Sequence, residues 1–126
     1  ELPNIALDGI LIDAPCSGSG TWNRNPDDAW RTEAKDVEKH GRRQPVMLGN
    51  VVPALKPGGR LVYAVCSITR TETLDVVEAL RNEHPELSPD PFEHPLTGGP
   101  TDGTLTLLPS DTHGDAMFIA RFVKNG

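Results

Sequence analysis

This chain of 126 residues has few cysteines, no long apolar run and no net positive charge. It contains two cysteines and nothing with the form of a signal peptide, so we expect a reducing, cytoplasmic setting and no structural disulfide. No stretch is long and apolar enough to suggest a membrane span, so we expect no membrane partner. The first residue is Glu1 and a strand is predicted soon after it, so we expect a piece of a longer protein.

The net charge of −6 excludes a protein that binds nucleic acid over most of its surface, because such binding needs lysine and arginine to neutralise phosphates. Any contact with nucleic acid must therefore be local. The best candidate segment runs from Arg24 to Arg43. Acidic residues are interleaved with its basic ones, which favours a solvated helix face over a binding surface.

Each of the two cysteines follows a short apolar run. Residues 8–13 precede Cys16, and residues 60–65 precede Cys66. The first run has the composition of a strand buried on both faces. If both runs are parallel strands of one sheet, both thiols emerge at its carboxyl edge, where such folds place their chemistry. We therefore predict that the two sulfurs face one cleft within roughly 10 Å of each other, since adjacent strands lie about 4.8 Å apart. The alternative is that each cysteine is a small buried apolar residue.

A helix and a turn are predicted between the two cysteines. Residues 46–55 carry apolar side chains at helical spacing, and Pro45 suits the first turn of such a helix. The Pro57-Gly58 pair then fits a type II turn, which needs a positive φ at its second central residue.

A second helix is predicted after Cys66. Thr69 and Glu72 form a capping-box pattern, in which Thr69 is the N-cap and the helix ends near His84. Its inner stripe is expected to consist of three apolar residues, Leu74, Val77 and Leu80.

The last part of the chain predicts an antiparallel hairpin at the edge of the sheet. Its strands are residues 104–108 and 116–123, and they follow a segment rich in proline and glycine, residues 87–103. Asp111, His113 and Asp115 alternate in the connecting loop, but such residues are typical of a solvated loop, and no metal site is predicted. The fold class is α/β: two parallel strands with helices and a closing antiparallel hairpin.

Two strings of residues resemble signature motifs of the RNA cytosine-5 methyltransferases of the Sun/Fmu (RsmB/RsmF-like) family. They are DAPCSGSG at residues 13–20 and LKPGGRLVYAVCS at residues 55–67. The resemblance implies a Rossmann-like, S-adenosylmethionine-dependent methyltransferase, of which residues 1–126 form the C-terminal half of the catalytic domain. The glycine-rich turn and the acidic residues that hold the cofactor in this family lie upstream and are absent here. Two departures are Val65, where the family has threonine, and Pro45, which interrupts a helix that is normally continuous.

The same resemblance assigns roles to four residues. Cys66 is the nucleophile that adds to carbon 6 of cytosine, and Cys16 helps to remove the proton from carbon 5 and release the product. Asp13 contacts the methionine part of S-adenosylmethionine or the N3 edge of cytosine. Pro15 fixes the loop that passes over the substrate base. A role of Asp13 in capping its own turn is the alternative. A helix that begins near Thr69 is expected to lower the pKa of Cys66.

The function that follows is methylation of carbon 5 of cytosine in RNA, specifically ribosomal RNA, by an enzyme of which this chain alone is inactive. Two alternatives stay open. One is a DNA cytosine-5 methyltransferase, in which Cys16 of the Pro-Cys pair is the nucleophile. The other is a non-catalytic, methyltransferase-like module that binds RNA or protein.

Strand 8–13 is expected to leave one edge open, because in this family its other neighbour is the first cofactor-binding strand. Such an edge tends to recruit another strand. We therefore expect either a homodimer through residues 8–13 or an edge covered by the chain's own N-terminal residues.

Overall fold

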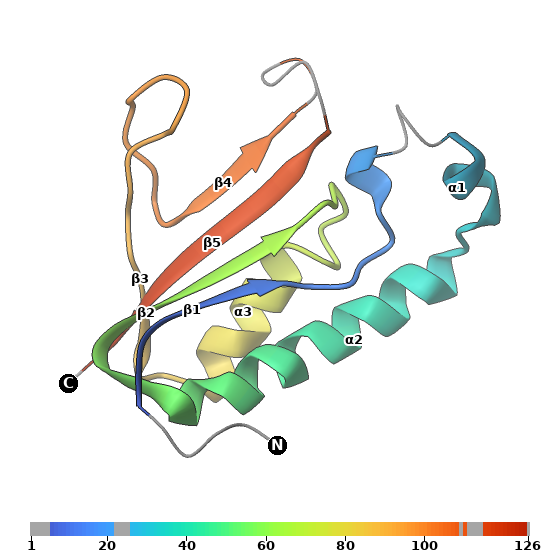
Figure 1. Ribbon diagram of the computed structural model, residues 1–126. Helices are drawn as coiled ribbons and strands as arrows, with labels where there is room; N and C mark the ends of the chain where they lie inside the picture. Colours follow the sequence, from blue (N-terminus) through green and yellow to red (C-terminus); the bar gives the residue numbers. More distant parts are fainter. Residues whose placement is uncertain (1–5, 22–25, 109, 111–114, 126) are drawn as a thin grey trace.

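The computed structural model of the protein describes residues 6–21, 26–108, 110 and 115–125. One five-stranded sheet organises them, with the order β1 (Leu7–Asp13), β2 (Leu55–Val65), β5 (Met117–Lys124) and β3 (Leu87–Pro89). Strand β4 (Thr104–Leu107) also pairs with β5. Strands β1 and β2 are parallel, whereas β5 is antiparallel to β2, β3 and β4 (Figure 1). The predicted α/β class, the parallel pair and the closing hairpin are confirmed.

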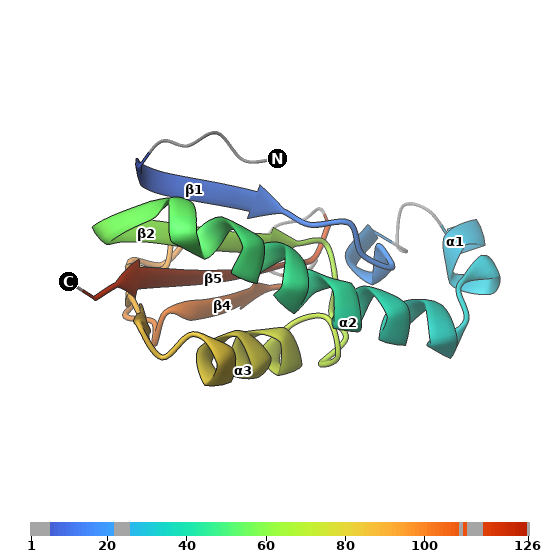
Figure 2. The same cartoon turned by 90° about the horizontal axis from the view of Figure 1, so that it is seen from below.

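Helices α2 (Ala34–Val51) and α3 (Leu74–Glu83) cover the same face of the sheet (Figure 2). The core lies between them and the sheet, and its largest buried side chains are Tyr63, Phe118, Phe122, Leu48, Leu61 and Leu80. The other face has no helix among the described residues. Leu11 of β1 is 68% exposed there, whereas Ile10 packs against the core. The prediction that β1 is buried on both faces is therefore wrong for the chain as it stands.

Helix α2 is longer than predicted and begins much earlier. It starts after Glu33, whose backbone N–H donates to the Asp36 carboxylate at 2.9 Å, and it continues through Pro45 to Val51. A proline inside a helix costs about 3 kcal/mol, but Pro45 lies on the buried face beside Leu48. Tertiary packing of this face outweighs the lost hydrogen bond. The predicted helix over 46–55 is thus wrong at both ends, since residues 52–54 form a short 3-10 turn.

Strand β2 also begins earlier than expected, at Leu55 rather than at residue 60. Residues 56–59 bulge out of the ladder, because Leu7 of β1 pairs with Leu55 while Gly9 pairs with Arg60. Gly58 has a φ of 81°, as the predicted turn requires. The turn is therefore built into the strand as an irregularity.

Helix α3 begins at Leu74, later than the predicted N-cap implies. Of the predicted inner stripe, Leu80 is buried, whereas Leu74 is 42% exposed. Val76, which the prediction missed, is buried in its place. The side chain of Glu72, just before the helix, is completely buried.

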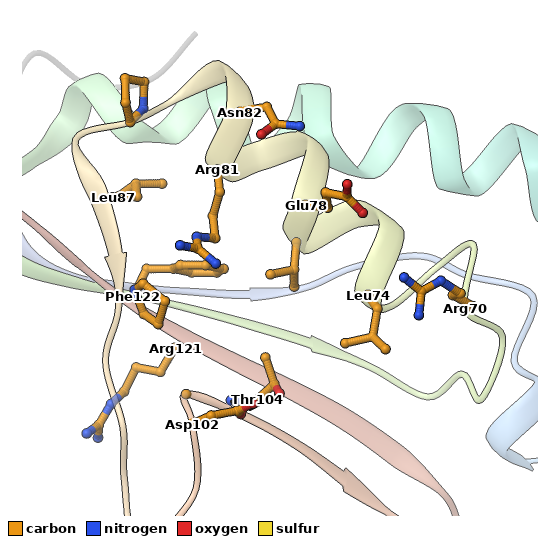
Figure 3. A pocket seen from close by; sticks show the side chains of 14 residues that line it. Arg70, Leu74, Glu78, Arg81, Asn82, Leu87, Asp102, Thr104, Arg121 and Phe122 are labelled. Carbon is orange, nitrogen blue, oxygen red and sulfur yellow. Dashed lines mark hydrogen bonds between the residues drawn. The ribbon is translucent and has the colours of Figure 1, made fainter.

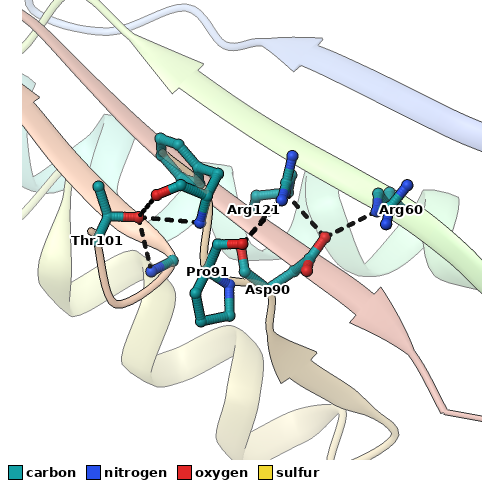
Figure 4. A network of polar contacts seen from close by, with 7 residues as sticks. Arg60, Asp90, Pro91, Thr101 and Arg121 are labelled. Carbon is teal, nitrogen blue, oxygen red and sulfur yellow. Dashed lines mark hydrogen bonds and ion pairs between the residues drawn. The ribbon is translucent and has the colours of Figure 1, made fainter. Parts of the chain in front are cut away.

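The proline- and glycine-rich segment after α3 is anchored to the sheet (Figure 4). Its first residues form β3, which pairs with β5. One carboxylate oxygen of Asp90 then lies 2.8 Å from Nε of Arg60 on β2 and 2.8 Å from Nε of Arg121 on β5. Arg121 also stacks over the ring of Phe92 at 5.2 Å. These contacts hold the loop across two strands.

Strand β1 is the last strand of the sheet, so its outer edge has no partner strand in the part of the chain that the structure describes. We expect this edge to drive dimerisation of the isolated chain, or else to be covered by residues 1–5, which lie outside the described residues. Sedimentation at high concentration and amide exchange of Ile10 to Ile12 test this. A monomer whose outward amides exchange like an exposed peptide would contradict the expectation.

None of the described helices is both long enough and apolar enough to cross a membrane.

Candidate functional site

The two cysteines lie at the same edge of the sheet, as predicted. Strands β1 and β2 are parallel, with Asp13 opposite Ala64, so their carboxyl ends coincide. The loop after β1 then crosses to the end of β2, where the Gly20 N–H donates to the Cys66 carbonyl at 2.9 Å. The Cys16 sulfur itself accepts hydrogen bonds from the backbone of Gly18, at 3.4 Å, and from the backbone of Cys66. Neither cysteine forms a disulfide, and both are half-buried.

The surroundings of Cys16 favour its neutral form. Burial raises the pKa of its thiol above the ordinary value, and the charge of Glu72 raises it further. The hydrogen bonds from the backbone of Gly18 and Cys66 oppose this effect without cancelling it. Because only a thiolate is strongly nucleophilic, Cys16 is a weak nucleophile at neutral pH.

Glu72 links the two cysteine loops, a role that the sequence analysis missed. Its side chain is completely buried. Its carboxylate accepts hydrogen bonds from the backbone N–H and the hydroxyl of Ser17, which follows Cys16, and from the hydroxyl of Ser67, which follows Cys66. The T-x-x-E pattern predicted a helix cap, and one half of that cap forms, because the Glu72 N–H donates to Thr69 Oγ1 at 3.3 Å. The predicted lowering of the Cys66 pKa assumed a helix that begins near Thr69. That assumption is wrong, because α3 begins at Leu74.

Asp13 and Pro15 lie between β1 and Cys16. Asp13 is exposed, and its carboxylate makes no hydrogen bond or ion pair with any described residue, so it does not cap its own turn. The Pro15 carbonyl accepts a hydrogen bond from Nε2 of Gln44 at 3.0 Å, which ties the loop to α2. Gln44 is buried, and its Oε1 has no partner among the described residues.

A cavity of about 250 Å³ opens beside Cys16. It is lined by the Cys16 loop, by the end of α1 (Pro26–Arg31) and by α2, and its charged lining residues are Arg31, Asp36, Lys39 and Arg43, with His40. Part of the segment interpreted as a solvated helix face therefore borders the candidate site. Cys66 does not line this cavity, so this cavity is not the predicted single cleft that both sulfurs face.

A larger hollow of about 610 Å³ lies elsewhere, between α3 and strands β3, β4 and β5 (Figure 3). Arg70, Arg81 and Arg121 contribute to its lining, together with Leu74 and Phe122. None of the predicted site residues borders it, so we do not include it in the candidate site. The described residues also contain no group of side chains that could hold a metal ion; Asp111 and His113 lie outside them.

Comparisons with known proteins identify the family of this chain. Residues 2–123 match the model of the family described as 16S rRNA methyltransferase RsmB/F. The probable ribosomal RNA small subunit methyltransferase B of Synechocystis is 36% identical over 122 residues, which cover 94% of this chain and 27% of that protein.

Solved structures show the same fold. The crystal structure of PH0851 superposes with a TM-score of 0.85 at 33% identity, over 93% of this chain and 26% of that one. NSun6 from Pyrococcus horikoshii superposes with a TM-score of 0.78 at 23% identity, over 98% of this chain and 32% of that one, and shows the fold alone. The chain thus spans about a quarter of the relative's length. With the Rossmann-like fold of S-adenosylmethionine-dependent methyltransferases, it belongs to the RsmB/F family of 16S rRNA methyltransferases.

Proposed function

We propose that the chain is the thiol-bearing part, residues 1–126, of a catalytic domain that methylates carbon 5 of a cytosine in ribosomal RNA, in the cytoplasm. Cys66 is the nucleophile, and Cys16 acts in product release. The observation that carries this proposal is that both cysteines lie at one sheet edge and neither forms a disulfide, while the Cys16 thiol is held neutral by burial.

The chemistry explains why two thiols are needed. Carbon 5 of cytosine is a poor nucleophile, so the Cys66 thiolate first adds to carbon 6 and forms a carbon–sulfur bond. The electron pair displaced from the 5,6 double bond makes the ring an enamine whose carbon 5 can take up an electrophilic methyl group. Loss of the proton from carbon 5 then restores the double bond, and the carbon–sulfur bond breaks to release the Cys66 thiolate. Cys16, whose sulfur lies against the Cys66 backbone, gives its own proton to the departing Cys66 thiolate and takes up the carbon 5 proton in exchange.

S-adenosylmethionine supplies the electrophilic methyl group when it is bound. NSun6 was solved with SFG, an analogue of this cofactor. In the present chain the exposed carboxylate of Asp13 at the end of β1 suits the ammonium group of the cofactor's methionine part or the N3 edge of cytosine. The exposed ring of Pro15 stiffens the adjoining loop, on the side where the substrate base enters. The other cofactor-binding residues are expected outside this chain.

The surroundings of Cys16 favour the RNA-type mechanism over the DNA-type one. In the DNA-type mechanism Cys16 would attack carbon 6, which requires it to be a thiolate. Burial and the charge of Glu72 raise its pKa and oppose this. Cys66 is then the better candidate for the attacking thiol.

The cavity beside Cys16 supports RNA as the substrate. Three cationic side chains, Arg31, Lys39 and Arg43, line it, and neither Lys39 nor Arg43 is in an ion pair with another described residue. Lys39 and Arg43 also line an adjoining open hollow of about 590 Å³ along α2. A local cationic path of this kind suits the phosphates that flank a flipped base, on a protein whose net charge is −6.

Incubating the intact protein with small-subunit ribosomal RNA and S-adenosylmethionine is expected to give 5-methylcytidine, detected by mass spectrometry of the RNA nucleosides. A DNA strand of the same sequence is the control and is expected to stay unmodified. Methylation at another atom, or of the DNA alone, would contradict the proposal, and RNA binding without methylation would favour the non-catalytic module. The 126-residue chain alone is expected to show no saturable binding of the cofactor by calorimetry.

A further inference from the structure

We propose that Glu72 is a positioning residue that fixes the loop bearing Cys16 against the loop bearing Cys66, and so sets the geometry of the two-thiol reaction. The inference rests on the proposed function for the roles of the two cysteines. The arrangement around Glu72 is itself a property of the fold and is tested separately below.

The carboxylate of Glu72 is the meeting point of both loops. From the Cys16 loop, the Ser17 N–H donates to Oε2 at 2.7 Å and the Ser17 hydroxyl donates to Oε1 at 2.6 Å. From the Cys66 loop, the hydroxyls of Ser67 and Thr69 donate to Oε1 at 2.9 and 3.0 Å. An ionised carboxylate only accepts hydrogen bonds, so it can satisfy all four donors at once.

The hydroxyl groups also order the backbone of both loops. While each donates to Glu72, Ser17 Oγ accepts the Ser19 N–H at 3.3 Å and Ser67 Oγ accepts the Thr69 N–H at 3.2 Å. A second link joins the loops directly, because Ser19 Oγ lies 3.2 Å from Ser67 Oγ and accepts the Ile68 N–H at 2.9 Å. The network thus fixes the backbone immediately after each cysteine.

Replacing the carboxylate of Glu72 would disrupt this network even if the new side chain had the same size. Glutamine has nearly the same shape, but its NH₂ group is a donor that would face groups which also donate. One or more buried hydrogen bonds would be lost and the loops would separate. Because an error of about 1 Å in the placement of reacting groups can reduce the rate about 100-fold, catalysis should suffer more than binding.

The charge of Glu72 has a second effect, since it helps to raise the pKa of Cys16 after burial, the larger cause. The other ionisable groups around this thiol are Cys66 and Tyr63 on the sheet side and Arg31, Asp36, Lys39, His40 and Arg43 across the cavity. Loss of the Glu72 charge should therefore lower the pKa of Cys16. Loss of an uncharged hydrogen-bonding group, such as the Ser17 hydroxyl, should not.

The kinetic test compares two variants of the intact protein. Glu72→Gln is expected to lower kcat for RNA methylation about 100-fold while KM for the RNA stays the same. Glu78→Gln, on the exposed side of α3, is the matched control and is expected to leave both constants unchanged. A folded Glu72→Gln variant with the parental kcat would overturn the proposal.

The structural test needs neither RNA nor cofactor, so it can fail independently of the proposed function. In this chain carrying Cys66→Ser, alkylation of Cys16 by iodoacetamide is followed as a function of pH. Adding Glu72→Gln is expected to lower the apparent pKa of Cys16, whereas adding Ser17→Ala, which keeps the charge, is not. Equal titration in all three proteins would overturn the proposal. If Glu72→Gln does not fold, amide exchange in the unmodified chain decides: a Ser17 N–H that exchanges like an exposed peptide refutes the link.

Discussion

Replacing Cys66 with serine in the intact protein is expected to abolish methyl transfer, whereas replacing Cys16 with serine is expected to leave the RNA covalently attached to the protein. Without Cys66 no carbon–sulfur bond forms at carbon 6, and the rate should fall by at least about 10⁴-fold, as when other covalent nucleophiles are removed. Without Cys16 the adduct forms and takes up the methyl group but is released slowly. Denaturing gels with labelled RNA distinguish the two results.

Two further samples make this experiment decisive. The double variant Cys16→Ser with Cys66→Ser is expected to show no adduct, because the attacking thiol is gone. Adding S-adenosylmethionine after RNA should increase the adduct in the Cys16→Ser variant, because methylation precedes the blocked step. An adduct that accumulates in the Cys66→Ser variant instead would reverse the two roles and favour the DNA-type mechanism.

Replacing Gly20 with alanine is expected to destabilise the chain by about 3 kcal/mol. Gly20 lies where three segments meet: its N–H donates to the Cys66 carbonyl at 2.9 Å, and its carbonyl accepts the Ala116 N–H at 2.7 Å. An added Cβ would lie 3.0 Å from the carbonyl carbons of both Cys66 and Ala116 and would overlap the Ala116 oxygen. Backbone atoms cannot move aside as a flexible side chain can, so the loop must shift. Urea unfolding followed by circular dichroism measures the loss.

Gly99 provides a control for the same substitution. A Cβ at Gly99 would meet only the Thr97 hydroxyl, at 3.4 Å, so Gly99→Ala should change the free energy of unfolding by less than about 0.5 kcal/mol. If Gly20→Ala were equally neutral, the close approach of these three segments would be refuted.

The sequence predicts those parts of the fold that depend on residues close together in the chain. The apolar runs before Cys16 and Cys66 predict parallel strands, and residues 104–108 and 116–123 predict the hairpin, because alternation and turn residues are local signals. Gly58 has the positive φ that the Pro-Gly pair requires. The placement of both thiols at one edge then follows from the rule for parallel sheets.

The errors occur where distant contacts decide the outcome. Pro45 is a helix breaker in isolation, yet α2 continues through it because the buried face packs on the sheet. Glu72 fits a helix-capping pattern, but its carboxylate binds Ser17, far away in the sequence. Strand β3 has only three residues and contains a proline, so no local signal identifies it, and its pairing with β5 defines it. The exposure of Leu11 likewise depends on what covers the sheet, not on the strand itself.

The position of β5 determines when the thiol edge can be completed during synthesis. β5 comes last along the chain among the described strands, yet it lies in the middle of the sheet, between β2 and the β3 and β4 strands. Ala116, at its start, binds the loop that carries Cys16. When both cysteines have been synthesised, the nascent chain therefore still lacks the strand that fixes their surroundings. The edge of β2 that pairs with β5 is then unpaired. The edge that carries the two thiols therefore takes its final form only after β5 has inserted beside β2.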